Sequence, residues 1–268
     1  MNIHAVSLKG RRDENEDKHN YIINKNGKNK NFAKVNFLGV YDGHGGKFVS
    51  KFLSKFLPDK FVHKSITYPV SPEYINTTYE TLNNILFTKY EKEATNCGAT
   101  CLVVLHYKNI QEKINYMHVL NTGDSRAVLC KNNIAITLTK DHKPNWPEEK
   151  ARIEKLNGKI YYDGDDYRIK DLSVSRAFGD KSAHPFVICT PDIMTYKLDN
   201  TDKFIVLACD GLWDVLSCQE VVNFILIECY ENADKRIKKE INIAKKLGEY
   251  AIQKGSSDNI TILVGFID

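Results

Sequence analysis

Three acidic residues stand where an apolar stretch of the sequence meets a turn. Asp42 follows the run FLGVY and precedes Gly43, Asp210 follows FIVLAC, and Asp258 comes just before NITILVGF. A carboxylate at the end of a buried strand is held by rigid backbone and still faces a ligand. Oxygen ligands without an accompanying set of cysteines and histidines favour Mg²⁺ or Mn²⁺ over zinc. The three positions therefore predict a site for a hard divalent cation.

A second acidic group and two basic side chains could complete such a site. The segment RRDENED follows the first apolar run and supplies Arg12, Glu16 and Asp17. Clustered carboxylates repel one another, and a bound cation would remove that repulsion. Arg12 carries a planar, permanent charge suited to a pair of phosphate oxygens. His44 stands two residues after Asp42, where it could donate a proton.

Each of these features also has an ordinary explanation when it is taken alone. An isolated Asp-Gly pair is typical of a simple turn, and a lone histidine is often structural. Asp124, in NTGDSR, could simply cap a tight turn between two strands. The repetition of acidic residues at strand ends, with an arginine beside one of them, favours the metal site.

The elements that must position these residues can be read from hydrophobic periodicity. Strands and helices do not alternate regularly, and most strands are separated by short Gly, Asn or Asp turns, which favours antiparallel pairing. The predicted fold is α+β, a layered sandwich with helices outside, and residues 1–268 are expected to form one domain. Strands are predicted over residues 3–8, 20–24, 35–41, 99–107, 114–120, 127–130, 203–209 and 259–266, and helices over 47–57, 73–94, 147–157, 219–231 and 233–254.

Several helix ends carry recognisable signals. Asn145, with Glu148 and Pro147 after it, is expected to cap the third helix, and Gly158 to follow it. Ser217 and Glu220 form a capping pattern before the fourth helix. The fifth helix is expected to bury an apolar stripe that consists of Ile237, Ile241, Ile243 and Leu247. The segment NKNGKNKN (24–31) is expected to form a solvated hairpin loop.

Composition excludes several classes of protein. The 268 residues are 42% hydrophobic, and 38 Lys and Arg against 34 Asp and Glu leave a net charge of +4, so a nucleic-acid partner is not expected. The seven cysteines include no CxxC pair and lie mostly in apolar runs, which indicates buried, reduced thiols. The sequence contains no signal-like or transmembrane stretch, so we expect a soluble cytoplasmic or nuclear protein. Asn2 rather than glycine follows Met1, so we do not expect N-terminal acylation.

Eight motifs along the chain resemble, in order, those of the metal-dependent protein Ser/Thr phosphatases of type 2C, the PPM family. They extend from residue 10 to the last strand, so the resemblance covers nearly the whole chain. The family fold is a four-layer α-β-β-α sandwich of two antiparallel sheets flanked by helix pairs. The motifs are GRRDENED, FLGVYDGHGG, CGATCLVVL, NTGDSRAVLC, TKDHKP with PEEKARIEKLNGKI, LSVSRAFGD, FIVLACDGLWDVL and GSSDNITILVGF.

The resemblance implies roles for individual residues. Asp42 would bridge two Mn²⁺ or Mg²⁺ ions, Gly43 would supply a backbone carbonyl to one ion, and Asp210 and Asp258 would hold the other. Glu16 and Asp17 match an acidic pair that binds or orients metal waters. By motif, Asp124 would share a weaker third ion with Asp210, and Arg12 would bind phosphate. His44 matches a general acid, and Asp214 matches a residue that lies outside the direct metal ligands.

The implied reaction is in-line displacement on phosphoserine or phosphothreonine of a protein substrate, without a phosphoenzyme. A hydroxide that bridges two ions would attack phosphorus while Arg12 and the metals neutralise charge, and His44 would protonate the leaving oxygen. The alternatives are a pseudophosphatase that only binds phosphoproteins, and a metal-dependent nuclease or phosphodiesterase. A monomer is expected.

The chain departs most from the family in residues 161–171. Ile169, Lys170 and Asp171 stand where the family has a glycine-containing turn. This region precedes a flap that shapes substrate access in the family. Substrate specificity is therefore the property that the departure affects.

Overall fold

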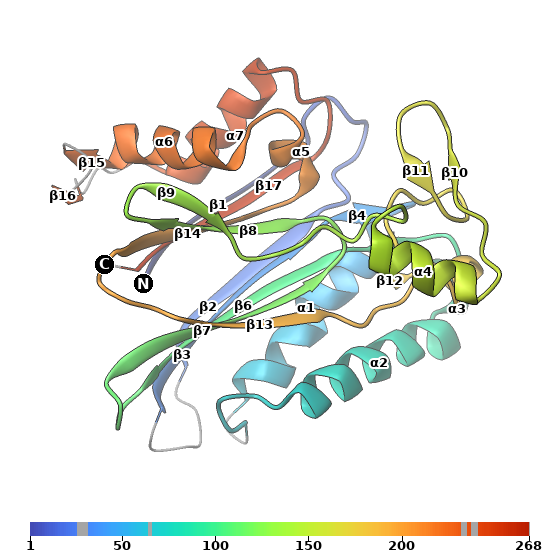
Figure 1. Cartoon of the computed structure of the whole chain (residues 1–268), viewed down its shortest axis with the longest axis horizontal. Coiled ribbons are helices and arrows are strands. Elements are labelled where there is room, and N and C mark those ends of the chain that lie inside the picture. Colours follow the sequence, from blue (N-terminus) through green and yellow to red (C-terminus); the bar gives the residue numbers. More distant parts are fainter. Residues whose placement is uncertain (26–31, 64–65, 232–234, 237–240, 268) are drawn as a thin grey trace.

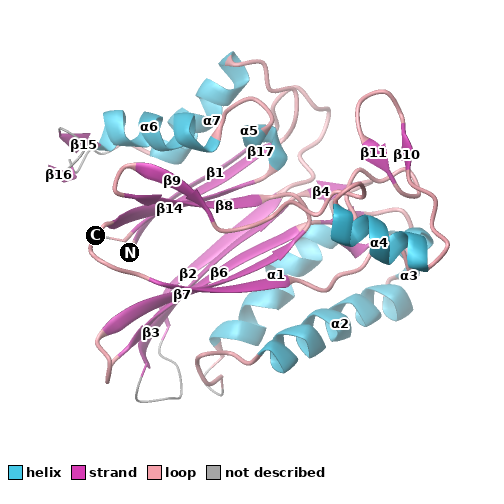
Figure 2. Cartoon of the chain, viewed as in Figure 1, coloured by secondary structure: helices cyan, strands magenta, loops and turns pink. Residues whose placement is uncertain are grey.

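The computed structural model of the protein describes residues 1–25, 32–63, 66–231, 235–236 and 241–267. Two five-stranded antiparallel sheets lie face to face, with helices on their outer faces (Figures 1 and 2), and this confirms the predicted α+β sandwich. One sheet has the order β1 (Asn2–Leu8), β17 (Ile260–Phe266), β14 (Asp202–Ala208), β8 (Arg126–Lys131) and β9 (Ile134–Thr137). The other has the order β13 (Asp192–Lys197), β7 (Ile114–Thr122), β6 (Cys101–Asn109), β3 (Phe32–Tyr41) and β2 (Lys18–Lys25).

Three buried layers of apolar side chains join the sheets and helices. Because successive strand residues point to opposite faces, Phe37 of β3 packs towards the helices and Leu38 towards the other sheet. Helices α1 (Phe48–Val62), α2 (Pro72–Lys89) and α3 (Glu91–Ala94) contribute to the layer that contains Phe37. Helices α5 (Asp210–Trp213), α6 (Cys218–Cys229) and α7 (Ile243–Gln253) pack on the sheet that contains β14.

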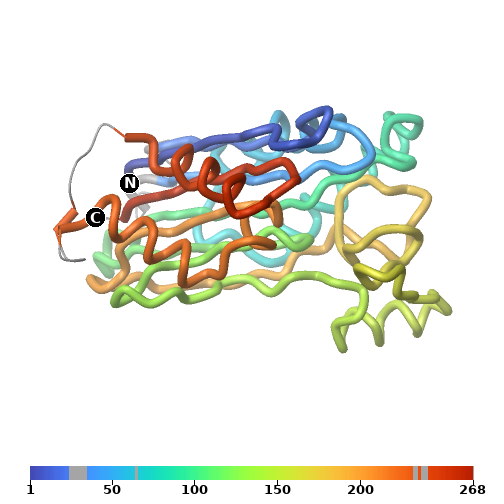
Figure 3. The backbone as a smooth tube through the Cα atoms, turned by 90° about the horizontal axis from the view of Figure 1, so that it is seen from above, coloured from blue at the N-terminus to red at the C-terminus, as the bar shows by residue number. Residues whose placement is uncertain are grey.

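A group of small elements lies at one end of the sandwich. It includes α4 (Pro147–Lys155) and the hairpin of β10 (Tyr161–Tyr162) and β11 (Tyr167–Arg168). Figure 3 shows that both chain termini lie at the opposite end. A three-stranded sheet connects this region to the sandwich, in the order β12 (Phe178–Gly179), β5 (Gly98–Ala99) and β4 (Gly43–His44).

All eight predicted strands are present, to within a few residues at their ends. Strands β9 and β13 were not predicted, and each lies at one edge of its sheet. Both carry side chains that are mostly exposed or half-buried, and their apolar runs are short, with three residues in IAIT and two in DIMTYK. The predicted loop at residues 24–31 lies largely outside the described residues.

The first two helices differ from their predicted extents. Helix α1 continues through Pro58 to Val62, although a proline removes a hydrogen bond to the carbonyl four residues earlier. That carbonyl belongs to Ser54, and it accepts a hydrogen bond of 2.5 Å from the Asn20 side chain instead. The stretch predicted as one helix over 73–94 is broken at Tyr90, which has non-helical backbone angles and packs its ring against Phe48.

The predicted ends of the later helices are partly correct. The capping box of Ser217 and Glu220 is present at α6, and Pro147 opens α4. The expected cap at Asn145 is wrong, because Trp146 occupies the N-cap position without a side-chain hydrogen bond. At the end of α4, Gly158 follows as predicted, but Asn157 adopts the left-handed conformation.

The helix predicted over 233–254 begins only at Ile243, after Asn242 caps it. Ahead of it, Tyr230–Glu231 and Lys235–Arg236 pair as the short strands β15 and β16. Ile243 and Leu247 are buried as expected, whereas Ile241 is exposed and was wrongly placed in the buried stripe. Ile237 lies outside the described residues.

The described thiols agree with the expectation of buried, reduced cysteines. All seven are free, and only Cys218 is partly exposed. Among the described residues, none of the helices combines the length and the apolar character needed to cross a bilayer.

Candidate metal and phosphate site

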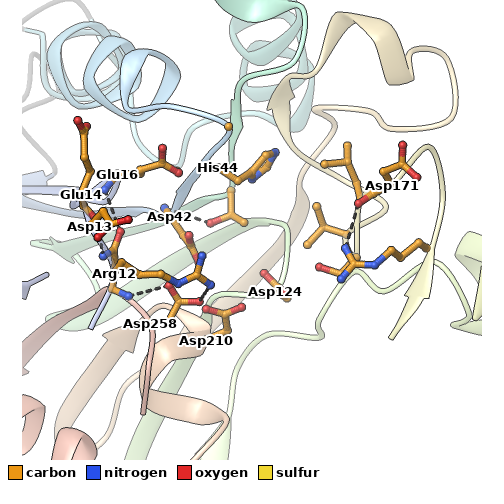
Figure 4. Close-up of a pocket in the computed structure, with 18 residues that line it drawn as sticks. Arg12, Asp13, Glu14, Glu16, Asp42, His44, Asp124, Asp171, Asp210 and Asp258 are labelled. Atoms are coloured by element: carbon orange, nitrogen blue, oxygen red, sulfur yellow. Dashed lines mark hydrogen bonds and ion pairs between the residues drawn. The ribbon is translucent and has the colours of Figure 1, made fainter. Parts of the chain in front are cut away.

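Four of the predicted acidic residues meet where strands of both sheets end. Asp42 follows β3, Asp210 follows β14, Asp258 precedes β17, and Asp124 lies in the turn between β7 and β8. They line one pocket of about 630 Å³ (Figure 4). Carboxylate oxygens of Asp42, Asp124 and Asp210 lie within 4.8 Å of one another. The pairing of two antiparallel sheets therefore assembles a cluster from distant parts of the sequence.

Thr100 and Gly43 fix the chain around Asp42. The Asp42 amide donates to the Thr100 hydroxyl at 3.3 Å, and the Thr100 amide donates to the Asp42 carbonyl at 2.9 Å. Gly43 lines the pocket, and a Cβ at this position would lie 2.4 Å from the backbone oxygen of Glu16. Only glycine allows this close approach, which brings the acidic loop against Asp42.

Asn259 holds that acidic loop in place. Its side-chain oxygen accepts a hydrogen bond of 2.8 Å from the Glu16 amide, and its side-chain nitrogen donates to the carbonyls of Lys9 and Glu14 at 2.8 and 2.9 Å. Glu16 reaches the pocket wall. Asp17 lies beneath the pocket, 2% exposed, and its carboxylate is within 4.8 Å of ligand atoms of Asp42 and Cys209.

The charges at the site are incompletely compensated by the protein. Burial raises the pKa of Asp42 well above its ordinary value, and the charges of Asp210 and Asp17 raise it further. Burial likewise raises the pKa of Asp210 well above its ordinary value, and the pKa of Asp17 to about 6. Both carboxylate oxygens of Asp17 are buried without a hydrogen-bond partner among the described residues. Unpaired, clustered carboxylates of this kind fit a hard divalent cation.

His44 lies at the wall of the same pocket and is paired with a residue that the sequence analysis did not single out. Its Nε2 is 2.7 Å from Oδ2 of Asp180, which is 3% exposed. Burial would lower the pKa of His44, but Asp180 together with the charges of Asp124 and Glu16 outweighs burial, and the pKa is raised. The pair is possible because Gly98 has no side chain; a Cβ there would lie 2.0 Å from Asp180 Oδ2. The imidazole is thus oriented and biased towards its protonated form.

Arg12 projects from the acidic loop, and its side chain is 60% exposed. Its Nη2 donates to Oδ2 of Asp258 at 2.7 Å, one of the contacts drawn in Figure 4. An exposed guanidinium beside the carboxylates can also reach a phosphate in the pocket. Asp214 is not among the residues that line the pocket, and burial raises its pKa. Its expected role beside the metal ligands, without direct contact to the ions, stays a prediction.

Residues 161–171, the segment that departs most from the family, contribute to the wall of the pocket. Lys170 and Asp171 have φ of +50° and +68°, and Ile169 and Leu172 on either side exchange two backbone hydrogen bonds of 3.0 Å. Such a two-residue turn needs left-handed backbone at both positions, which glycine adopts most easily. Here two non-glycine residues adopt it. Asp171 and Arg168 line the pocket, and Asp171 lies across it from Arg12 (Figure 4), so this departure from the family lies at the site itself.

Comparison with known proteins agrees with the motifs. The sequence profile described as protein phosphatase 2C matches residues 1–260. A PP2C-like domain-containing protein of Acanthamoeba polyphaga mimivirus is 45% identical over 173 residues, which are 58% of this chain and 97% of that protein. The integrin-linked kinase-associated serine/threonine phosphatase 2C of Mus musculus is 33% identical, with 97% of this chain and 71% of that protein aligned. Probable protein phosphatase 2C 7 of Oryza sativa subsp. japonica is 32% identical over 96% of this chain, which spans only 63% of the rice protein.

Solved structures share the fold. A sex-determining protein of C. elegans has a TM-score of 0.83 at 24% identity, covering 100% of this chain and 65% of that chain. A phosphatase from a pathogenic strain of Toxoplasma gondii has a TM-score of 0.82 at 24% identity, covering 98% and 92%. With the profile match over nearly the whole sequence, the chain belongs to the protein phosphatase 2C family and is homologous to its serine/threonine phosphatases.

Proposed function

We propose that this chain is a Mg²⁺- or Mn²⁺-dependent protein phosphatase that hydrolyses phosphoserine and phosphothreonine in proteins, and that residues 1–268 act as one catalytic domain. The observation that carries this proposal is the meeting of Asp42, Asp124 and Asp210 within 4.8 Å, in a pocket that Arg12 and His44 also line. Acidic residues would hold the metal, and the two basic residues would act on the phosphate and the leaving group.

The residues present could bind two divalent ions, and they include further ligands for a third. Asp42, the Gly43 carbonyl, Asp210 and Asp258 would hold two ions, and Asp124 would share a third with Asp210. Glu16 and Asp17 would bind or orient coordinated water. When bound, such ions lower the pKa of coordinated water to give a nucleophile, and they neutralise charge on the phosphate.

The protein's own residues would do the remaining work. Arg12 would bind phosphate oxygens through its exposed guanidinium and stabilise the charge that spreads in the transition state. His44 would protonate the departing serine or threonine oxygen. Asp180, 2.7 Å from Nε2, would keep the imidazole oriented and charged for that step. In-line displacement then needs no covalent intermediate.

Phosphate release from a phosphothreonine peptide tests this proposal, with Mg²⁺, Mn²⁺ or EDTA added to purified protein. We expect release that requires the metal. No release under any metal by a folded sample would favour the phosphoprotein-binding module instead. A parallel assay with a phosphodiester separates the other alternative, because diester cleavage without activity on the phosphopeptide would indicate a nuclease or phosphodiesterase.

A further inference from the structure

The ammonium group of Lys143 lies directly on a carboxylate of the proposed metal site. Its Nζ is 2.5 Å from Oδ2 of Asp124. The side chain of Asp124 is 3% exposed and that of Lys143 is 24% exposed. Asp124 is the residue proposed to share a third ion with Asp210. At this end of the site, the protein therefore supplies a positive charge of its own.

The two residues before Lys143 are held by hydrogen bonds, so this contact is built into the fold. Arg126 donates to both carboxylate oxygens of Asp141, at 2.8 Å from Nε to Oδ1 and 2.8 Å from Nη2 to Oδ2. The His142 amide donates to the Gly123 carbonyl at 3.0 Å, and the Gly123 amide donates to His142 Nδ1 at 3.1 Å. The turn that carries Asp124 and the loop that carries Lys143 are thus tied together at neighbouring residues.

Lys143 is positively charged in this position. A lysine carries its charge at neutral pH, and here the ammonium lies 2.5 Å from a carboxylate oxygen of Asp124. A divalent ion of this kind lies about 2.0 to 2.1 Å from a carboxylate oxygen when it is Mg²⁺. The ammonium and such an ion cannot occupy the same side of Asp124 Oδ2 together, and their charges repel.

We infer that Lys143 is a tethered counter-ion that competes with a divalent cation for Asp124 and so weakens the third metal site. This inference rests on the proposed function, because it concerns ions at the same carboxylates. The flexible four-carbon stem of Lys143 lets the ammonium withdraw when an ion binds. Occupancy of the third site then depends on the metal concentration.

Calorimetric titration with MnCl₂ tests the inference directly. We compare the wild type with Lys143→Met, which removes the charge, and Lys143→Arg, which keeps it. Lys150→Met is the matched control, because Lys150 is an exposed lysine of α4 that pairs with Glu154 and not with the site. We expect Lys143→Met to tighten the weakest Mn²⁺ by roughly tenfold or more, which corresponds to about 1.4 kcal/mol. Lys143→Arg and Lys150→Met should stay near the wild-type value.

An unchanged weakest affinity in Lys143→Met, or an equal shift in Lys150→Met, would overturn the inference. Circular dichroism reports whether Lys143→Met folds. If it does not, Lys143→Gln replaces it in the same titration and must tighten the weakest Mn²⁺ in the same way. Wild-type protein that binds no Mn²⁺ and releases no phosphate would refute the proposed function as well. Wild-type protein that binds Mn²⁺ and releases phosphate, with no effect of Lys143, would refute this inference alone.

Discussion

Replacing Glu149 by glutamine tests the ion-pair network that joins α4 to the chain around β12 and β13. Glu149 is 4% exposed. Its Oε1 accepts from Arg176 at 2.7 and 3.0 Å, and its Oε2 accepts from Arg152 at 2.7 Å. Arg176 also donates to Asp192 at 2.8 Å, and Arg152 to the Phe186 carbonyl at 2.8 Å. The buried carboxylate of Glu149 thus positions two arginines, which in turn bind Phe186 and Asp192.

The size of the effect follows from the pKa of Glu149. Burial alone would raise this pKa, but Arg176 and Arg152 outweigh burial and lower it from 4.5 to about 2. A difference of about 2.5 pKa units corresponds to about 3 kcal/mol of folding free energy at neutral pH. Removal of one partner from a buried ion pair typically costs about 3 to 5 kcal/mol, which agrees. We therefore expect Glu149→Gln to lower the free energy of unfolding by about 3 kcal/mol at pH 7.

The sign of the pH dependence is fixed by the lowered pKa. The stabilisation by Glu149 is fully present above pH 4.5, the pKa of the unfolded chain, and is lost as the pH falls from 4.5 towards 2. The difference between wild type and Glu149→Gln should therefore be constant from pH 7 to pH 5.5 and shrink only below that window.

Urea unfolding followed by circular dichroism measures this difference at each pH. Glu148→Gln is the matched control, because Glu148 is 70% exposed and pairs with Lys140 on the surface, so its loss should cost far less. A difference under about 1 kcal/mol at pH 7 would show that the network contributes little to stability. A difference that already falls between pH 7 and pH 5.5 would show that the pKa of Glu149 is not lowered.

Three further predictions concern the site. Asp180→Asn should slow phosphopeptide hydrolysis by about 100-fold. Hydrolysis of an aryl phosphate should slow much less, because its good leaving group needs little protonation. Equal effects on both substrates would contradict a role of Asp180 through His44. Gly98→Ala should reproduce this pattern, since its Cβ would lie 2.5 Å from His44 Nε2, and an unchanged substrate ratio in kinetic assays would refute it. EDTA should lower the thermal unfolding midpoint and MnCl₂ raise it, because bound ions offset the repulsion among the clustered carboxylates; a midpoint insensitive to both would argue against a metal site.

Asp42, Asp210 and Asp258 could be predicted because each stands at one end of an apolar strand, whereas the role of Asp124 was implied only by its motif. Such strands are recognised from local sequence, and antiparallel sheets bring their ends to a common edge. The partners of these residues could not be predicted in the same way. Asp180 is 136 positions from His44, and Lys143 is 19 positions from Asp124, so both contacts depend on the tertiary fold. Their only sequence signal was membership of the motifs LSVSRAFGD and TKDHKP.

Helix ends were less predictable than strands, for reasons that particular contacts show. By local rules Pro58 would end α1. The side-chain amide of Asn20, on β2, donates to the Ser54 carbonyl and so replaces the lost backbone hydrogen bond. Tyr90 interrupts the helical pattern after α2 because its ring is held by Phe48 and Phe52 of α1. In both places tertiary packing overrides the local signal.

The most direct test of the account is the metal-dependent release of phosphate from a phosphothreonine peptide by Asp42→Asn and Asp210→Asn. Asp59→Asn, at an exposed position of α1, makes the same change in net charge away from the pocket. We predict that the two pocket variants stay folded and lose activity by a factor of about 1000 or more, while Asp59→Asn keeps wild-type activity. Near-normal phosphate release by either folded pocket variant would contradict the assignment of this site.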